Sequence, residues 1–344
     1  MGKLALIGKL ITVHLPAGIV KIMAPKRDTY RGEMIDPKAY ALGRLANMLR
    51  GDGPMPTVAE SRAQMAKIAV TFDKKGPAVA RVEDIEVAGA NGPLKARLYS
   101  DHTDITTAHP ALVYYHGGGF IQGDLDTHHE TCLKLAKRWG GVVIAVDYRL
   151  APENPYPAGV DDAKMAYLDV VARAAELGIS PQNIGVGGDS AGGCFAAVVT
   201  QQVRNDGGPT PRFQVLIYPV TDGNMTTASI RELEFAYVLP KTRMTWYRDQ
   251  YAGDFSDFND PKFSPLMADD FSNLPDTYIL TGGFDPLVDD GALYAGKLEQ
   301  AGNNVTYRHF PGQIHAFINL TKVIPEGTQA LDEIADWLRG LPDV

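Results

Sequence analysis

The sequence contains little cysteine and no excess of positive charge. Two cysteines among 344 residues, Cys132 and Cys194, are too few for a disulfide framework or a cysteine metal site. We predict that both face the core from helices. The 33 Lys and Arg residues are scattered and are outnumbered by 41 Asp and Glu, which gives a net charge of −8 and no basic surface for nucleic acid. The composition therefore favours chemistry on small molecules.

Long apolar runs are also absent. The aliphatic segment from Leu4 to Met23 is interrupted by Lys9, Pro16 and Lys21, and no small-residue cleavage site follows it. The segment is too broken for a membrane span or a secretory signal. We therefore expect a cytoplasmic protein with an amphipathic N-terminal helix, whose lysines leave peripheral contact with a membrane surface as an alternative.

Apolar runs of strand length alternate with helical patterns along most of the chain. Two alternating segments, 82–87 and 94–99, flank Asn91-Gly92 and predict an antiparallel hairpin. Further strands, several of them apolar on both faces, are predicted at 111–115, 142–146, 213–218, 277–280 and 305–309. This order predicts an α/β fold, with a mostly parallel sheet between two helical layers and ligand chemistry at the carboxyl ends of the strands.

Two other parts of the chain predict a cap. Helical patterns precede the first strand, and one of them opens with a capping box at Thr57 and Glu60. Residues 220–260 interrupt the later alternation with an aromatic-rich insertion. We assign residues 1–75 to an N-terminal helical cap region and residues 76–344 to a catalytic domain, with the insertion contributing to the cap.

A serine flanked by glycines lies between one apolar run and a predicted helix. Gly188, Ser190 and Gly192 form the pattern G-x-S-x-G. This pattern is typical of a nucleophile elbow, a tight turn that presents the serine hydroxyl at the edge of a sheet. A glycine-rich turn before a buried helix is the structural alternative, so the surrounding residues have to decide between them.

An acid and a base follow this serine in the chain order that such an architecture requires. Asp285 follows the predicted strand 277–280, and His315 follows the last predicted strand. Asp289 lies one helical turn beyond Asp285, and we treat it as a supporting acid. His309 falls inside a strand pattern, and we expect it to be structural.

The segment His116-Gly117-Gly118-Gly119-Phe120 follows the predicted strand 111–115. Three consecutive glycines cost conformational entropy on folding, and close approach of the backbone to a ligand explains them. The run from Asp124 to Glu130 contains carboxylates and histidines, but Thr127 and Glu130 fit a capping box and no other ligand converges there. We therefore expect neither a metal nor a cofactor.

Together these segments resemble the hormone-sensitive lipase family of α/β-hydrolases, the bacterial family IV esterases in particular. Four motifs carry the resemblance: HGGGF at 116–120, YRLAPE at 148–153, GDSAGG at 188–193, and DPLVD at 285–289 with His315. Asp189 before the serine matches the GDSAG subgroup. Ala316 departs from the pattern, because glycine is common after this histidine.

The resemblance implies a role for each matching residue. The catalytic triad would be Ser190, Asp285 and His315. The backbone N–H groups of the oxyanion hole would belong to Gly118, Gly119 and Ala191. The supporting residues would be His116, which fixes the loop, Gly117, which sets its turn, Asp189, Asp289 and Glu153. Glu153 would lie with Arg149 and Asp162 in a buried polar cluster beneath the site.

The predicted function is hydrolysis of short- to medium-chain acyl esters through an acyl-enzyme intermediate. An amidase or a specialised deacetylase could use the same residues, and a non-catalytic small-molecule receptor is a remote alternative. The expected partner is a small ester, with no nucleic acid. The oligomeric state stays open, a homodimer included.

Overall fold

The computed structural model describes residues 12–51 and 53–342. Its main sheet has eight strands in the order β10-β9-β8-β7-β5-β6-β4-β3. These strands are β3 (Arg81–Gly89), β4 (Gly92–Ser100), β5 (His109–Tyr115), β6 (Val142–Val146), β7 (Ile179–Asp189), β8 (Phe213–Ile217), β9 (Asp276–Phe284) and β10 (Val305–Ile314). β4 pairs antiparallel with β3 and β6, and every other neighbour pair is parallel. The predicted α/β fold with a mostly parallel sheet is confirmed.

Every predicted strand is present, but β9 is longer than the sequence suggested. It continues to Phe284, because Gly282 still pairs with Phe310 and Phe284 pairs with Ile314 of β10. A β-carbon on Gly283 would lie 2.0 Å from the carbonyl oxygen of Pro311, so this edge needs glycine. As a result, β9 ends immediately before Asp285, and β10 ends immediately before His315.

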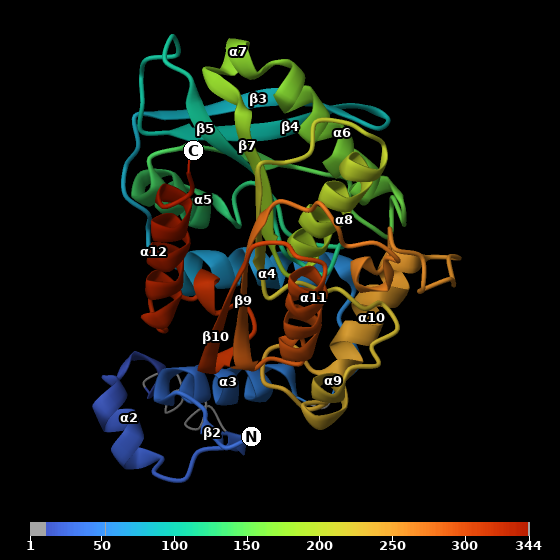
Figure 1. The fold of residues 1–344 in the computed structure, drawn as a ribbon. Helices are drawn as coiled ribbons and strands as arrows, with labels where there is room; N and C mark the ends of the chain where they lie inside the picture. Colours follow the sequence, from blue (N-terminus) through green and yellow to red (C-terminus); the bar gives the residue numbers. More distant parts are fainter. Residues whose placement is uncertain (1–11, 52, 343–344) are drawn as a thin grey trace.

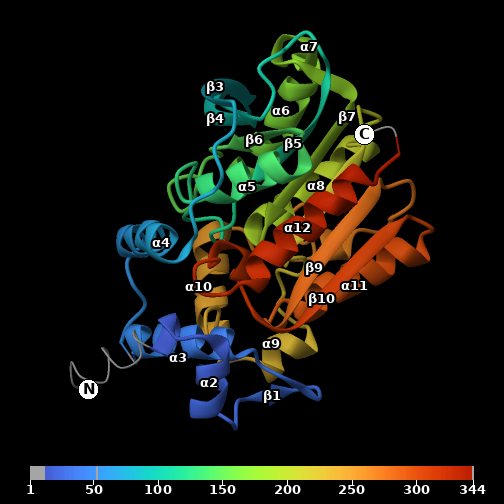
Figure 2. The same ribbon diagram turned by 90° about the vertical axis from the view of Figure 1, so that its left-hand side faces the viewer.

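Helices cover both faces of the sheet (Figures 1 and 2). α5 (His129–Trp139) and α12 (Glu326–Arg339) lie on one face. α6 (Ala158–Ala172), α7 (Ala174–Leu177), α8 (Ala191–Asn205) and α11 (Val288–Gln300) lie on the other side of the sheet or at its upper end. The strand period of two divides the core accordingly. In β5, for example, Leu112 and Tyr114 join the apolar cluster with α5 and α12, whereas Val113 and Tyr115 join the cluster with α6 and α8.

The N-terminal segment and the insertion gather at the carboxyl ends of the parallel strands (Figure 1). The N-terminal elements are α2 (Ala17–Met23), β1 (Thr29–Tyr30), β2 (Glu33–Met34), α3 (Pro37–Arg50) and α4 (Val58–Phe72). The insertion carries α9 (Ala228–Glu232) and α10 (Lys241–Ala252), and the short helices η1 (Pro265–Met267) and η2 (Phe317–Asn319) complete the elements.

One of the two predicted capping boxes is present. The Thr57 side chain accepts from the backbone of Glu60, and Glu60 accepts from the backbone of Thr57, so α4 begins as expected. The box predicted at Thr127 and Glu130 is wrong. α5 begins after His128 without a side-chain cap, and Glu130 instead accepts a hydrogen bond from the backbone N–H of Gly76. The Thr127 hydroxyl is taken by the backbone of Asp124, so it is not available to cap the helix.

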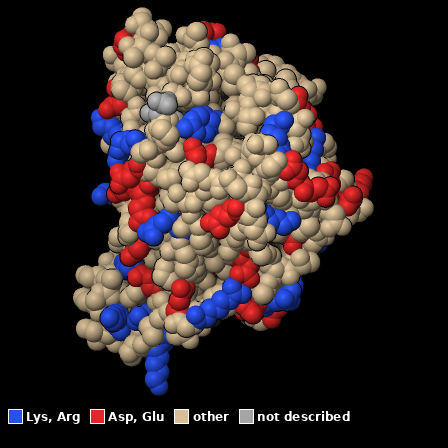
Figure 3. Space-filling view, viewed as in Figure 1, with Lys and Arg blue, Asp and Glu red and all other residues tan. Residues whose placement is uncertain are grey.

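Both cysteines are buried thiols on helices, as predicted. Residues 4–11 of the predicted N-terminal helix lie outside the described residues, and its described part is interrupted at Leu15 and Pro16 before α2 begins. Among the described helices, none is both long enough and apolar enough to cross a membrane. On the face shown in Figure 3, acidic and basic side chains are interspersed.

Candidate active site

The turn between β7 and α8 holds Ser190 in a strained conformation. Its φ of 55° lies in the left-handed region, which a non-glycine residue adopts only under tight constraint. The flanking glycines are required by close packing. A β-carbon would lie 2.2 Å from the carbonyl oxygen of Tyr115 at Gly188 and 1.8 Å from it at Gly192. The structure therefore has the sharp strand-to-helix turn that the G-x-S-x-G pattern predicts.

Three side chains from separate parts of the chain meet at this turn. His315 Nε2 lies 3.0 Å from Ser190 Oγ, and His315 Nδ1 lies 2.7 Å from Asp285 Oδ2. The other carboxylate oxygen of Asp285 accepts from the backbone N–H of Leu287. Asp285 is fully buried, and only 7% of Ser190 and of His315 is exposed. The row of hydroxyl, imidazole and carboxylate is thus shielded from solvent, and the ring of Tyr218 packs against the imidazole.

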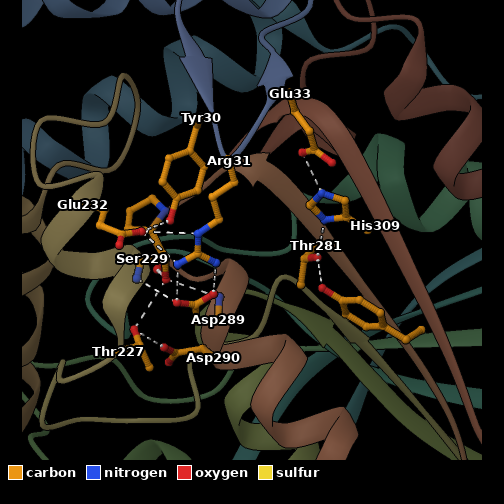
Figure 4. Close-up of polar contacts among 12 residues, drawn as sticks. Tyr30, Arg31, Glu33, Thr227, Ser229, Glu232, Thr281, Asp289, Asp290 and His309 are labelled. Carbon is orange, nitrogen blue, oxygen red and sulfur yellow. Dashed lines mark hydrogen bonds and ion pairs between the residues drawn. The ribbon is translucent and has the colours of Figure 1, made fainter.

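The two rival residues point elsewhere (Figure 4). Asp289 accepts two hydrogen bonds from Arg31, at the tip of the β1–β2 hairpin, and one from the backbone N–H of Ser229. His309 lies between Thr281 and Glu33, with its Nε2 3.0 Å from the Glu33 carboxylate. Neither side chain contacts the row that contains Ser190. Asp289 instead joins the N-terminal hairpin to the first turn of α11.

The glycine loop after β5 lies against the serine turn. The backbone N–H of Gly117 donates to Asp189, and a β-carbon there would lie 2.4 Å from the Asp189 carboxylate. Gly118 and Gly119 have φ of 132° and 60°. Within the described residues, the backbone N–H groups of Gly118 and Gly119 have no hydrogen-bond acceptor. The N–H of Ala191, the first residue of α8, is also free of an intrahelical partner, as at every helix start.

Asp189 joins four segments of the site. Besides Gly117, its carboxylate accepts from the hydroxyl of Tyr114 at 2.7 Å and from the amide of Asn319 at 3.2 Å, and it lies 3.3 Å from His128 Nε2. Asn319 belongs to η2, directly after His315. A single buried carboxylate therefore ties the serine turn to the glycine loop, to α5 and to the segment of the histidine.

Burial and the neighbouring charges together set the pKa values of the ionisable groups around Asp189. Burial alone would raise the pKa of Asp189, but the charge and hydrogen bond of His128 and the other donors lower it to about 2. Burial opposes protonation of His128, and the Asp189 carboxylate overcomes it and raises the His128 pKa. Burial, together with the charge of His128, lowers the pKa of His116 to about 4. His116 is thus neutral and stacks on Tyr148. Its Nδ1 donates to the Gly117 carbonyl at 2.8 Å, and the Tyr148 hydroxyl lies 3.3 Å from the same nitrogen.

One predicted supporting residue lies elsewhere. Arg149 and Asp162 do form a pair, with Arg149 Nε 2.7 Å from the fully buried Asp162 carboxylate. Glu153 is not part of it. Its side chain is 57% exposed and binds Arg62 of α4. A carboxylate that can remain in water avoids the desolvation cost of the core, so Glu153 pairs with the N-terminal segment rather than with the buried arginine.

Sequence reasoning missed several residues around the glycine loop. His128 appeared only within a run of acidic and histidine residues, and Asn319 lies in a segment without a pattern. The ring of Tyr247, on α10, packs over Gly119, where a β-carbon would lie 2.5 Å from it. Gln122 binds both the Tyr247 hydroxyl and Ser61 of α4. No sequence signal marks these contacts, because they join segments far apart in the chain. Among the described residues, no group of three or more His, Cys, Asp or Glu side chains could hold a metal ion.

The chain is similar to known proteins over most of its length. Residues 112–319 match the profile of a family described as having the alpha/beta hydrolase fold. The carboxylic ester hydrolase LipN of Mycobacterium tuberculosis is 35% identical over 348 residues, which cover 98% of this chain and 92% of LipN. The ethyl acetate hydrolase of Pseudomonas putida is 36% identical over 81% of this chain and 89% of its own. The ester hydrolase EH1AB1 from the metagenome of Lake Arreo superimposes with a TM-score of 0.85 and 39% identity, over 89% of this chain and 98% of its own.

The fold and these similarities define the protein as an α/β-hydrolase that acts on carboxylic esters. Within that class, the chain belongs to the hormone-sensitive lipase-like family, the bacterial family IV esterases. The expected family, fold and enzyme class are therefore confirmed.

Proposed function

We propose that Ser190, His315 and Asp285 form the catalytic triad of an esterase for short- to medium-chain acyl esters. The observation that carries the proposal is the continuous row of hydrogen bonds from Ser190 Oγ through both ring nitrogens of His315 to Asp285, at 3.0 and 2.7 Å. A serine hydroxyl is a weak nucleophile until a neighbouring base accepts its proton, and the base needs a partner that fixes its tautomer.

The reaction proceeds in two acyl transfers. In the first, Ser190 Oγ attacks the ester carbonyl carbon, its proton passes to His315 Nε2, and the carbonyl oxygen becomes an oxyanion. When the tetrahedral intermediate collapses, the bond to the alkoxy oxygen breaks and His315 protonates the departing alcohol. Water then repeats the sequence, with His315 as base, and releases the carboxylic acid and free Ser190.

The oxyanion would rest on the backbone N–H groups of Gly118, Gly119 and Ala191. These three donors lack protein acceptors in the described structure, and the N-terminus of α8 adds the positive end of its dipole. The remaining supporting residues act through position: Asp189 and Gly117 hold the glycine loop against the serine turn, and His116 fixes its start.

The N-terminal region 1–75 and the insertion 220–260 would form the cap over the site. Arg62 of α4 donates to the backbone of Ile121 and Ala151, and α10 places Tyr247 on Gly119. Because Ser190 is 7% exposed beneath these elements, a substrate has to enter a confined space rather than meet a broad apolar surface. We therefore propose acyl chains of about two to eight carbons, since a longer chain would not fit in the confined space without displacing the cap.

Hydrolysis of p-nitrophenyl esters from acetate to palmitate tests this function. The expected optimum lies among the short acyl chains, and Ser190→Ala should stay folded and lose roughly four orders of magnitude or more in kcat. A preference for palmitate would refute the chain-length proposal, and hydrolysis by Ser190→Ala within tenfold of the native rate would refute the nucleophile. A matched anilide, tested beside the ester, distinguishes the esterase from an amidase. Inactivity on both substrates would refute the enzyme and favour the non-catalytic receptor.

A further inference from the structure

Two arginines of the proposed cap lie close to each other near the glycine loop, and neither has a counter-ion among the described residues. Arg243 is on α10 and Arg50 ends α3. In the described part of the chain, Arg243 donates only to the hydroxyls of Tyr247 and Ser61, at 3.2 and 3.4 Å, and Arg50 only to the carbonyl of Tyr237. All of these partners are neutral. Every ion pair among the described residues uses a cation other than Arg50 and Arg243.

The site contains more hydrogen-bond donors than acceptors. The Nε of Arg243 is buried and has no hydrogen-bond partner among the described residues. The Tyr247 hydroxyl accepts from Arg243 and from Gln122, at 3.2 and 3.0 Å, and finds no described acceptor for its own proton. A buried donor without an acceptor costs free energy, so such an arrangement indicates a missing acceptor.

The charges of the two arginines also oppose each other. Burial lowers the pKa of Arg50, and the charge of Arg243 lowers it further. The guanidinium of Arg243 lies 5.8 Å from the ring centre of Trp246 and 5.7 Å from that of Tyr247, and these contacts stabilise a cation only in part. Two like charges this close, on side chains that are both only partly exposed, would be relieved by one anion between them.

The place of this pair in the fold relates it to catalysis. Tyr247, which carries the shared hydroxyl, is the residue whose ring lies on Gly119, and Gln122 of the same loop donates to that hydroxyl. An anionic group bound by Arg243 would thus lie one side chain away from the glycine loop. A substrate whose ester carbonyl lies at the glycine loop could therefore reach Arg243 with an anionic group elsewhere on the same molecule.

We infer that Arg243, assisted by Arg50 and the Tyr247 hydroxyl, binds a carboxylate on the substrate, so that the preferred esters are monoesters of short dicarboxylic acids. The inference rests on the proposed esterase function, for which it names the substrate class. A planar guanidinium with a free Nε can bind a carboxylate through two parallel hydrogen bonds, and a neutral alkyl chain would leave those donors unpaired.

The test compares anionic and neutral esters of equal length. The substrates are the monoethyl esters of succinic, glutaric and adipic acid, each paired with the ethyl ester in which a methyl group replaces the free carboxylate, and acid release is followed in a pH-stat. Arg243→Gln should lower kcat/KM for the best anionic ester tenfold or more, and change its neutral partner less than threefold. Arg243→Lys keeps the charge but not the paired geometry, so its kcat/KM for the anionic ester should lie between those of the native protein and Arg243→Gln.

A matched variant controls for the loss of one positive charge. Arg173→Gln removes a surface arginine that pairs with Asp169 and Glu176 between α6 and α7, so it should leave the ratio of anionic to neutral rates unchanged. Equal losses on both esters of a pair in Arg243→Gln, or no loss on either, would overturn the inference.

Direct binding separates this inference from the proposed chemistry. Calorimetry with monoethyl glutarate and the Ser190→Ala protein should detect binding that Arg243→Gln abolishes in the same background. If the native protein hydrolyses the neutral esters but this binding is absent, the substrate class is wrong and the esterase function stands. If binding is present but no ester is hydrolysed, the proposed catalytic function is wrong and the anion site stands.

Discussion

Arg31 and Asp289 form a bidentate ion pair, with Nη1–Oδ1 and Nη2–Oδ2 distances of 2.6 and 3.0 Å (Figure 4). Arg31 occupies the turn of the β1–β2 hairpin, and Asp289 lies in the first turn of the helix that follows Asp285. Glu232 of α9 accepts from the same guanidinium and from the hydroxyl of Tyr30. This contact fastens the N-terminal hairpin and the insertion to the segment that carries the proposed catalytic acid.

Removal of residues 1–35 should therefore affect the proposed cap more than the catalytic row. We expect a lower kcat/KM for p-nitrophenyl butyrate and a flatter dependence of rate on acyl length. Arg31→Ala should change far less, because its side chain is 45% exposed and such ion pairs contribute only about 0.2–1 kcal/mol. An acyl-length series for the three proteins provides the measurement, and an unchanged profile in the truncated protein would refute the cap assignment.

The roles of the two neighbouring aspartates can be separated by amide substitution. Asp285→Asn should reduce kcat by roughly 10⁴-fold, because an amide no longer selects the histidine tautomer that can accept the serine proton. Asp289→Asn should act on stability and on the hairpin, with kcat within about tenfold of the native value, since it contacts Arg31 and Ser229 rather than His315. Steady-state rates and thermal unfolding of both variants decide the assignment, and the opposite ranking would exchange the roles.

Gly119 should tolerate no side chain. Its φ is 60°, and a β-carbon would lie 2.5–2.8 Å from the ring atoms of Tyr247. Gly119→Ala should therefore move the loop and lower kcat by about 10²- to 10³-fold, the usual effect of losing an oxyanion donor. Gly140→Ala is the matched control, because Gly140 has a φ of 86° but open space around it. The control should cost only about 1 kcal/mol of stability and leave kcat unchanged. Similar activity in both variants would contradict a role for the Gly119 N–H.

Asp290 should make the protein less stable as the pH rises from about 4 to 7. Burial raises its pKa to about 7, despite hydrogen bonds from the backbone of Thr221 and Asp222. A carboxyl whose pKa is raised on folding holds its proton more tightly in the folded state, so its ionisation opposes folding above the unfolded pKa of about 4. The free energy of unfolding of the native protein should fall across this range relative to Asp290→Asn.

Chemical denaturation at pH 4, 5.5 and 7 measures this difference. Each pKa unit corresponds to about 1.4 kcal/mol, so the full effect is on the order of a few kcal/mol. Asp289→Asn serves as the control from the same helical turn, because the pKa of Asp289 is lowered through Arg31 and Ser229 although burial would raise it. Parallel pH profiles of the native protein and Asp290→Asn would show that Asp290 does not titrate in this range.

The sequence alone determined the succession of strands along the chain, the fold class and the chain order of serine, acid and histidine. These features depend on local physics: the periodicity of apolar residues, the glycines of a tight turn, and the ends of buried strands. The glycines at 188 and 192 could be assigned to an elbow because no other residue fits such a turn. Asp285 and His315 could be placed because each follows a strand of a parallel sheet, whose carboxyl ends meet at one edge.

Only the tertiary structure decided which charged groups meet. Glu153 was expected in the core beside Arg149, but it pairs with Arg62 at the surface, where its charge stays hydrated. The buried contact between Asp189 and His128, and the lack of a described counter-ion for Arg243, are equally invisible in the sequence. Long side chains bring together segments separated by tens or hundreds of residues, and the cost of desolvation, rather than any local pattern, selects their partners.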